Sequence, residues 1–154
     1  MDSNKIHVIF VCHGNICRSP MAEFVMKELA KSVGLLEKFV ITSAAVSTEE
    51  IGNDMYPPAK RKLYEKQIPF AYKRARQITR EDYLGNDYVI IMDKSNRRWL
   101  QYIIGEDSDG KVSQLMEWTG ENRDVADPWY TGDFEQAYQD IEKGCRAILE
   151  KLIK

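Results

Sequence analysis

The stretch IHVIFVCHGNICRSPMAEFVMKEL, residues 6–29, contains the change of pattern that decides the fold. Residues 6–11 are an almost continuous run of β-branched and aromatic side chains, which is typical of a strand covered on both faces. From Ser19 the apolar residues recur at helical spacing until Gly34, and a glycine commonly ends a helix. The stretch therefore predicts a buried strand, a tight loop and an amphipathic helix.

The rest of the chain repeats this alternation. Residues 39–42, 87–92 and, more weakly, 112–115 are predicted strands, and helices are predicted from Pro57 and over residues 95–104 and 134–152. Alternating strands and helices indicate a three-layer, doubly wound α/β fold of the flavodoxin-like or Rossmann-like kind, with a four-stranded parallel sheet. Ligands of such sheets bind at the carboxyl ends of the strands, where residues 12–19 follow the first strand.

Length and composition narrow the possible functions. The 154 residues fit one domain, and a formal net charge of −2 argues against a nucleic-acid binder that works through bulk charge. The apolar run at residues 8–12 is too short for a secretion signal or a membrane span. We therefore expect a single domain over residues 1–154 that is cytoplasmic and binds neither nucleic acid nor membrane.

The cysteines point to a reactive thiol. Cys12, Cys17 and Cys145 are an odd number in a chain without a secretion signal, so a structural disulfide framework is not expected. No second Cys or His pair completes a zinc site with Cys12 and Cys17, and no metal is predicted.

The loop after the first strand has the properties of an anion site. Its backbone N–H groups and the positive end of the following helix are expected to converge on one point, as in phosphate sites. Gly14 and Asn15 are suited to the positive φ angles of such a loop, and Arg18 can hold two phosphate oxygens at once. A nucleotide-binding Walker loop needs a second glycine and a lysine that this loop lacks.

The thiol at the start of the loop adds chemistry to binding. The same N–H groups and Arg18 favour the thiolate form of Cys12, which would then attack phosphorus. Ser19 is placed to donate a hydrogen bond to that thiolate and improve it as a leaving group.

The motif C-x5-R-S within VCHGNICRSPMAE resembles the phosphate loop of the low-molecular-weight protein tyrosine phosphatases. Segments 74–83, 87–100, 124–130 and 133–149 resemble that family in the same order. The resemblance implies hydrolysis of phosphotyrosine through a phosphocysteine, without metal or cofactor, on phosphotyrosine-containing proteins and in some members beside a cognate tyrosine kinase. By the same resemblance, Cys12 is the nucleophile and Arg18 is the clamp that holds the phosphate. The supporting hydrogen-bond network consists of Asn15, Ser19 and Ser43. The phosphate-binding loop between nucleophile and clamp consists of His13, Gly14, Asn15, Ile16 and Cys17.

A general acid for the leaving group is offered by Asp127 in the segment ADPWY. Pro128 holds the preceding residue in an extended conformation and stiffens the loop, and the family resemblance makes Asp127 the acid. Trp129 and Tyr130 follow; they either form an aromatic slot for an aryl group or cap the edge of the core.

Several residues depart from the family pattern, among them Ala45 and Val46, which replace a Gly-Thr pair. Glu49, followed by Glu50, stands where many members place an aromatic wall of the substrate slot, and Lys73 stands where many carry a histidine of the network. The two glutamates either favour phosphotyrosine with basic flanks or are a solvated pair. His13 replaces an apolar residue; it either adds charge near the pocket or is a tolerated substitution at its rim.

Two further alternatives concern Cys17 and the reaction. Cys17 either packs behind the loop or, by resemblance, forms a reversible disulfide with Cys12. Arsenate reductases of this fold need two further cysteines in mid-chain, and none lies between Cys17 and Cys145. A protein arginine phosphatase is less expected because Ile16 replaces the threonine of that group, and a non-catalytic phosphate-binding relative would not need Cys12, Arg18 and Asp127 together.

Overall fold

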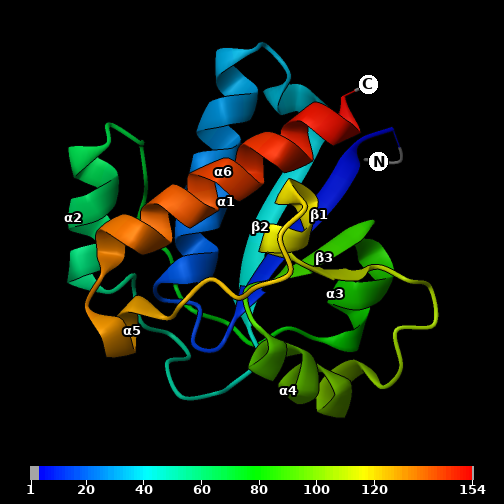
Figure 1. Cartoon of the computed structure of the whole chain (residues 1–154). Helices are drawn as coiled ribbons and strands as arrows, with labels where there is room; N and C mark the ends of the chain where they lie inside the picture. The colour runs from blue at the N-terminus through cyan, green and yellow to red at the C-terminus, as the bar shows by residue number, and fades with distance from the viewer. Residues whose placement is uncertain (1–3, 154) are drawn as a thin grey trace.

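The computed structural model describes residues 4–153 and arranges them around one parallel four-stranded sheet (Figure 1). The strands are β1 (Ile6–Cys12), β2 (Phe39–Ala45), β3 (Tyr88–Ile91) and β4 (Val112–Gln114), in the spatial order β2-β1-β3-β4. Every neighbouring pair is parallel. The predicted α/β class and its parallel sheet are confirmed.

Helices cover both faces of the sheet. On one face lie α1 (Arg18–Ser32) and α6 (Phe134–Leu152), with α2 (Pro57–Glu65) packed against α6. On the other face lie α3 (Arg80–Gly85) and α4 (Lys94–Ile104). Three short elements complete the described chain: η1 (Leu36–Lys38), η2 (Leu115–Thr119) and α5 (Pro128–Thr131).

Alternating residues of β1 supply the two cores that hold these layers together. Val8 and Phe10 pack with α1 and α6, whereas Ile9 and Val11 pack with α3 and α4. All four side chains are fully buried, which explains why the strand reads as a continuous apolar run rather than an alternating one.

The helix α3 was not predicted from apolar periodicity. It is short, and of its residues only Tyr83 is buried. Its sequence signal is a capping box, in which the Thr79 side chain accepts from the Asp82 N–H and the Asp82 carboxylate accepts from the Thr79 N–H.

The strand order places the functional loop. The chain leaves β1 towards α1 on one face and leaves the adjacent β3 towards α4 on the other, so a crevice opens at the carboxyl ends of these two strands. Within residues 4–153, no helix is long and apolar enough to cross a membrane.

Candidate active site

The loop between β1 and α1 wraps around the sulfur of Cys12. The Sγ atom accepts hydrogen bonds from the backbone N–H groups of Asn15, at 3.3 Å, and Ser19, at 3.4 Å, and lies 3.0 Å from the Ser19 hydroxyl. The first turn of α1 carries no side-chain cap, and its Ser19 N–H faces the sulfur instead. These donors stabilise negative charge on the sulfur, as predicted for a nucleophilic thiolate.

The backbone of the loop differs from the prediction at one residue. Asn15 has φ 61°, whereas Gly14 does not take a positive φ. Space is what Gly14 provides, because a Cβ there would lie 3.3 Å from Cγ of Glu50. The expectation for Asn15 therefore matches the geometry, and the expectation for Gly14 was wrong.

A chain of hydrogen bonds runs from the interior to the sulfur. The Asn15 side-chain amide donates to the hydroxyls of Ser19, at 2.8 Å, and Ser43, at 3.0 Å. The Ser43 hydroxyl donates to Glu23 at 2.6 Å. Because the Ser19 hydroxyl accepts from Asn15, its own proton can go to the Cys12 sulfur at 3.0 Å or to the Ala44 carbonyl at 3.4 Å, and the sulfur is the nearer acceptor. Sequence reasoning included Asn15, Ser19 and Ser43 in this network and missed Glu23.

Lys73 lies at the inner end of this network. Its Nζ atom is 3.8 Å from Glu23 and donates to the Ser43 carbonyl at 3.4 Å. Burial lowers the pKa of Lys73, and the nearby Glu23 carboxylate opposes that shift. The lysine therefore occupies the network position that the family resemblance assigns to a histidine in many members.

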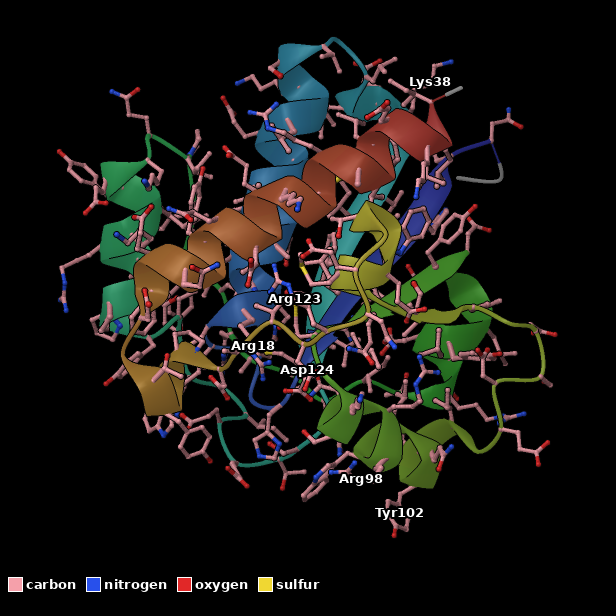
Figure 2. The ribbon with its side chains drawn as sticks, in the orientation of Figure 1. Arg18, Lys38, Arg98, Tyr102, Arg123 and Asp124 are labelled. Carbon is pink, nitrogen blue, oxygen red and sulfur yellow. The ribbon has the colours of Figure 1, made fainter. Side chains whose placement is uncertain are left out.

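Arg18, which is labelled in Figure 2 and begins α1, is held by groups from two distant segments. One terminal nitrogen donates to Asp93 at 2.8 Å and to the Val125 carbonyl at 2.7 Å, and the other donates to Asp127 at 3.3 Å. Burial alone would lower the pKa of Arg18, but the acidic groups around it, first Cys12, outweigh burial and raise that pKa. The guanidinium is thus fixed in the charged form beside the loop.

Asp93 is a functional residue that sequence reasoning missed. It lies two residues after the end of β3 and caps α4, accepting from the Asn96 N–H at 2.8 Å. Burial would raise its pKa, but Arg18, together with the hydrogen bonds from Ser95 and Asn96, outweighs burial and lowers it. Its place at the carboxyl end of a central strand was a usable signal.

Asp127 lies at the mouth of the loop and caps α5. One carboxylate oxygen accepts from the Trp129 N–H at 3.1 Å, and the other faces Arg18. The Asp127 side chain is 23% exposed, so it can reach both a bound phosphate ester and water. Its position fits the predicted general acid.

These groups line one pocket with an empty volume of about 490 Å³, its open mouth included. Trp129 and the mostly exposed Tyr130 supply the aromatic part of its lining. The ring of Tyr56, which does not itself line the pocket, packs on Trp129 with 4.6 Å between centroids. The residues that line the pocket are Cys12, His13, Gly14, Ile16, Cys17, Arg18, Glu49, Glu50, Asp127, Trp129 and Tyr130.

His13 and Glu49 also line the pocket. The His13 Nε2 and Glu49 Oε2 atoms are 3.1 Å apart, and the edge of Trp99 from α4 packs on the His13 ring with centroids 5.2 Å apart. The structure therefore brings together the predicted pocket residue Glu49 and the loop residue His13.

Cys17 and Cys145 are free thiols buried in the interior. Cys17 packs in a small cluster with Ile16 and Ala75, and burial, followed by the negative charge of Cys12, raises its pKa. Within residues 4–153, no group of three or more His, Cys, Asp and Glu side chains could hold a metal ion.

Comparison with known proteins identifies the family. The family model for low molecular weight phosphotyrosine protein phosphatase matches residues 7–154. The low molecular weight protein-tyrosine-phosphatase YfkJ of Bacillus subtilis is 37% identical over 151 residues, covering 97% of each chain. Its crystal structure superposes with a TM-score of 0.92 over 96% of this chain and 94% of that one.

Two further solved structures bear on the reaction. SP-PTP, a low molecular weight protein tyrosine phosphatase from Streptococcus pyogenes, is 41% identical, with a TM-score of 0.85 over 97% of this chain and 94% of that one. DARP, the drosophila arginine phosphatase, is 26% identical, with a TM-score of 0.86 over 96% and 98% of the two chains. The fold is thus common to both kinds of phosphatase, and the match over nearly the whole chain shows that this protein belongs to the low molecular weight phosphotyrosine protein phosphatase family.

Proposed function

We propose that this protein hydrolyses phosphotyrosine monoesters in proteins through a phosphocysteine formed on Cys12. The observation that carries the proposal is the position of the Cys12 sulfur, at the end of β1 and under the N–H groups of Asn15 and Ser19. Arg18 and Asp127 lie beside it in the same pocket. Membership of the family supports the same reaction.

In the first step, the Cys12 thiolate attacks phosphorus in line with the ester oxygen. A sulfur–phosphorus bond forms, the bond from phosphorus to the ester oxygen breaks, and Asp127 donates its proton to the leaving phenolate. The backbone N–H groups of the loop and the Arg18 fork stabilise the equatorial phosphate oxygens.

In the second step, water replaces the sulfur. Asp127, now a carboxylate, takes a proton from the attacking water, and the sulfur–phosphorus bond breaks to release phosphate. The thiolate of Cys12 leaves with its electron pair, and the Ser19 hydroxyl, 3.0 Å from the sulfur, stabilises that charge by a hydrogen bond.

The pocket walls favour an aryl ester over phosphoarginine. Trp129, supported by the ring of Tyr56, offers a stacking surface, and Ile16 lines the pocket as an apolar residue that is 7% exposed. A flat phenyl ring fits such a surface, whereas a phosphorylated guanidino group seeks hydrogen-bond partners that Ile16 does not supply.

Cys17 is proposed to protect the nucleophile from irreversible oxidation. Peroxide would convert the Cys12 thiolate to a sulfenic acid, and the Cys17 thiol would then form a disulfide with release of water. A reductant thiol restores both cysteines. Loss of reversible inactivation in Cys17→Ala would support this role, whereas unchanged reversibility would remove it.

The sequence predictions about cellular context belong to the same proposal. These are one phosphatase domain over residues 1–154, a cytoplasmic location and a cognate tyrosine kinase as partner. Three free, buried cysteines fit a reducing compartment.

The direct test is hydrolysis of p-nitrophenyl phosphate by the wild type, Cys12→Ser and Asp127→Asn. Activity in the wild type that is abolished in Cys12→Ser supports the proposal. Absence of wild-type activity between about pH 5 and 7 favours a non-catalytic phosphate-binding protein. Side-by-side turnover of phosphotyrosine and phosphoarginine peptides then separates the two classes of phosphatase.

A further inference from the structure

Part of the lining of the catalytic pocket is polar. His13, Glu49 and Glu50 form this part, called here the acidic wall, and all three residues line the pocket. His13 lies within 3.1 Å of Glu49, while Trp99 supports the His13 ring from α4. The Glu49 side chain remains 63% exposed, so it presents its charge at the mouth.

Glu50 is positioned independently of Glu49. Its Oε1 atom accepts a hydrogen bond from the Asn53 side-chain amide at 2.9 Å, and its Cγ atom lies against Gly14 of the loop. Because an amide is neutral, this partner leaves the full negative charge of Glu50 at the pocket.

Two carboxylates at the entrance of a phosphate pocket oppose the approach of a phosphate dianion. The repulsion is offset when the substrate carries positive charge next to its phosphorylated residue. Arg18 offsets this repulsion only in part, because its guanidinium charge is shared with Asp93 and Asp127. With the phenyl ring stacked on Trp129, the 63% exposed Glu49 is left at the mouth for the groups that flank the phosphotyrosine.

We propose that the acidic wall of His13, Glu49 and Glu50 selects phosphotyrosine flanked by arginine or lysine. This inference rests on the proposed function and names the substrate class for the same pocket. His13 holds Glu49 at the rim, and Glu49 and Glu50 bind the cationic side chains next to the phosphotyrosine.

The test uses three phosphotyrosine peptides that are identical except for Arg, Ala or Glu on both sides of the phosphotyrosine. The wild type is expected to prefer the Arg peptide over the Ala peptide by about two- to tenfold in kcat/KM, since an exposed charge pair contributes up to about a factor of five. In Glu49→Gln/Glu50→Gln that preference should fall to within about twofold. The matched control is Glu150→Gln, an exposed glutamate of α6 outside the pocket, which should keep the wild-type ratio.

Salt provides a measurement that needs no variant. At about 1 M salt the Debye length falls to about 3 Å, so a preference based on charge should collapse in the wild type, whereas one based on shape should persist. Equal turnover of the three peptides at low salt, or a preference for Arg that is unchanged in high salt, would overturn the proposal.

Binding to Cys12→Ser separates this inference from the proposed function. If the wild type hydrolyses p-nitrophenyl phosphate but Cys12→Ser binds the three peptides equally, the proposed phosphatase function is supported and the proposed selectivity of the acidic wall is overturned. If the wild type hydrolyses none of the substrates, while Cys12→Ser binds the Arg peptide most tightly, the proposed phosphatase function is overturned and the selectivity of the acidic wall is supported.

Discussion

The guanidinium of Arg18 and the carboxylate of Asp93 form an ion pair with 2.8 Å between Nη1 and Oδ2. The side chains are 2% and 16% exposed, so the pair lies largely out of water. It joins the first turn of α1 to the N-cap of α4, two segments that follow adjacent strands. The pair fixes the guanidinium where the phosphate is expected to bind.

Asp93→Asn is expected to weaken both phosphate binding and the fold. The amide keeps the cap of α4 but removes the negative charge beside Arg18, which costs about 1–3 kcal/mol of stability. The inhibition constants for phosphate and vanadate should rise about tenfold, because about 1.4 kcal/mol of lost binding corresponds to that factor. Asp133→Asn, which changes the cap of α6 without touching Arg18, is the control. Equal effects of the two variants on the inhibition constants would contradict the assigned role.

The same ion pair makes the free energy of unfolding depend on pH in the acidic range. The pKa of Asp93 in the folded protein lies below its usual value of 3.8, so the folded state binds fewer protons than the unfolded state as pH falls through this range. The stabilisation is complete above about pH 4 and is lost as pH falls through the lowered pKa. Urea titrations between about pH 2 and 6 should therefore show a shallower loss of unfolding free energy in Asp93→Asn than in the wild type.

Asp127→Asn should reduce turnover in a way that depends on the leaving group. The amide can still accept from the Trp129 N–H and cap α5, but it has no proton to give. With phosphotyrosine or phenyl phosphate, kcat should fall by about 10²–10⁴. The loss should be smaller with p-nitrophenyl phosphate, whose phenolate leaves without protonation. A loss that is the same for all leaving groups would contradict the role of general acid.

The conformation of Asn15 should separate backbone strain from side-chain function. Asn15→Gly relieves the φ of 61° but removes both donors to Ser19 and Ser43, whereas Asn15→Ala also keeps a Cβ in the left-handed region. In urea unfolding, the alanine variant should be about 1 kcal/mol less stable than the glycine variant. Both variants should have a lower kcat than the wild type. Equal stability of the two variants would show that the left-handed backbone imposes no cost.

Gly144 in α6 should resist substitution because of its packing. A Cβ at this position would lie 2.4 Å from Cγ of the fully buried Leu115. Gly144→Ala should destabilise by about 1–3 kcal/mol, although alanine is the better helix former. Gly85→Ala in α3, where a Cβ meets no atom within 4 Å, is the matched control and should be neutral or stabilising.

Much of the fold, and the loop from Cys12 to Arg18 in the site, could be predicted because their sequence signals are local. The β1 run and the steps of α6 give strand and helix directly, and the loop from Cys12 to Arg18 is contiguous in the chain. A contiguous loop between a strand and a helix has a narrow set of conformations, so its residue types already specify an anion site. The helix α3 was not predicted because its apolar pattern is too short to show periodicity.

The partners of that loop depended on tertiary structure. Asp93 meets Arg18 across 75 residues of sequence, and Ser43 meets Glu23 across 20. The strand order β2-β1-β3-β4 brings these residues together, and no local pattern encodes it.

The sequence by itself determined the chemistry of the loop: a thiol, an arginine and a left-handed asparagine on a strand-to-helix turn. Only the tertiary structure decided that Gly14 serves close packing rather than a positive φ, and that the separate departures His13 and Glu49 meet at one wall. The physical reason is that residue type and short-range spacing set backbone preference and reactivity, whereas contacts between distant segments are set by how the layers pack.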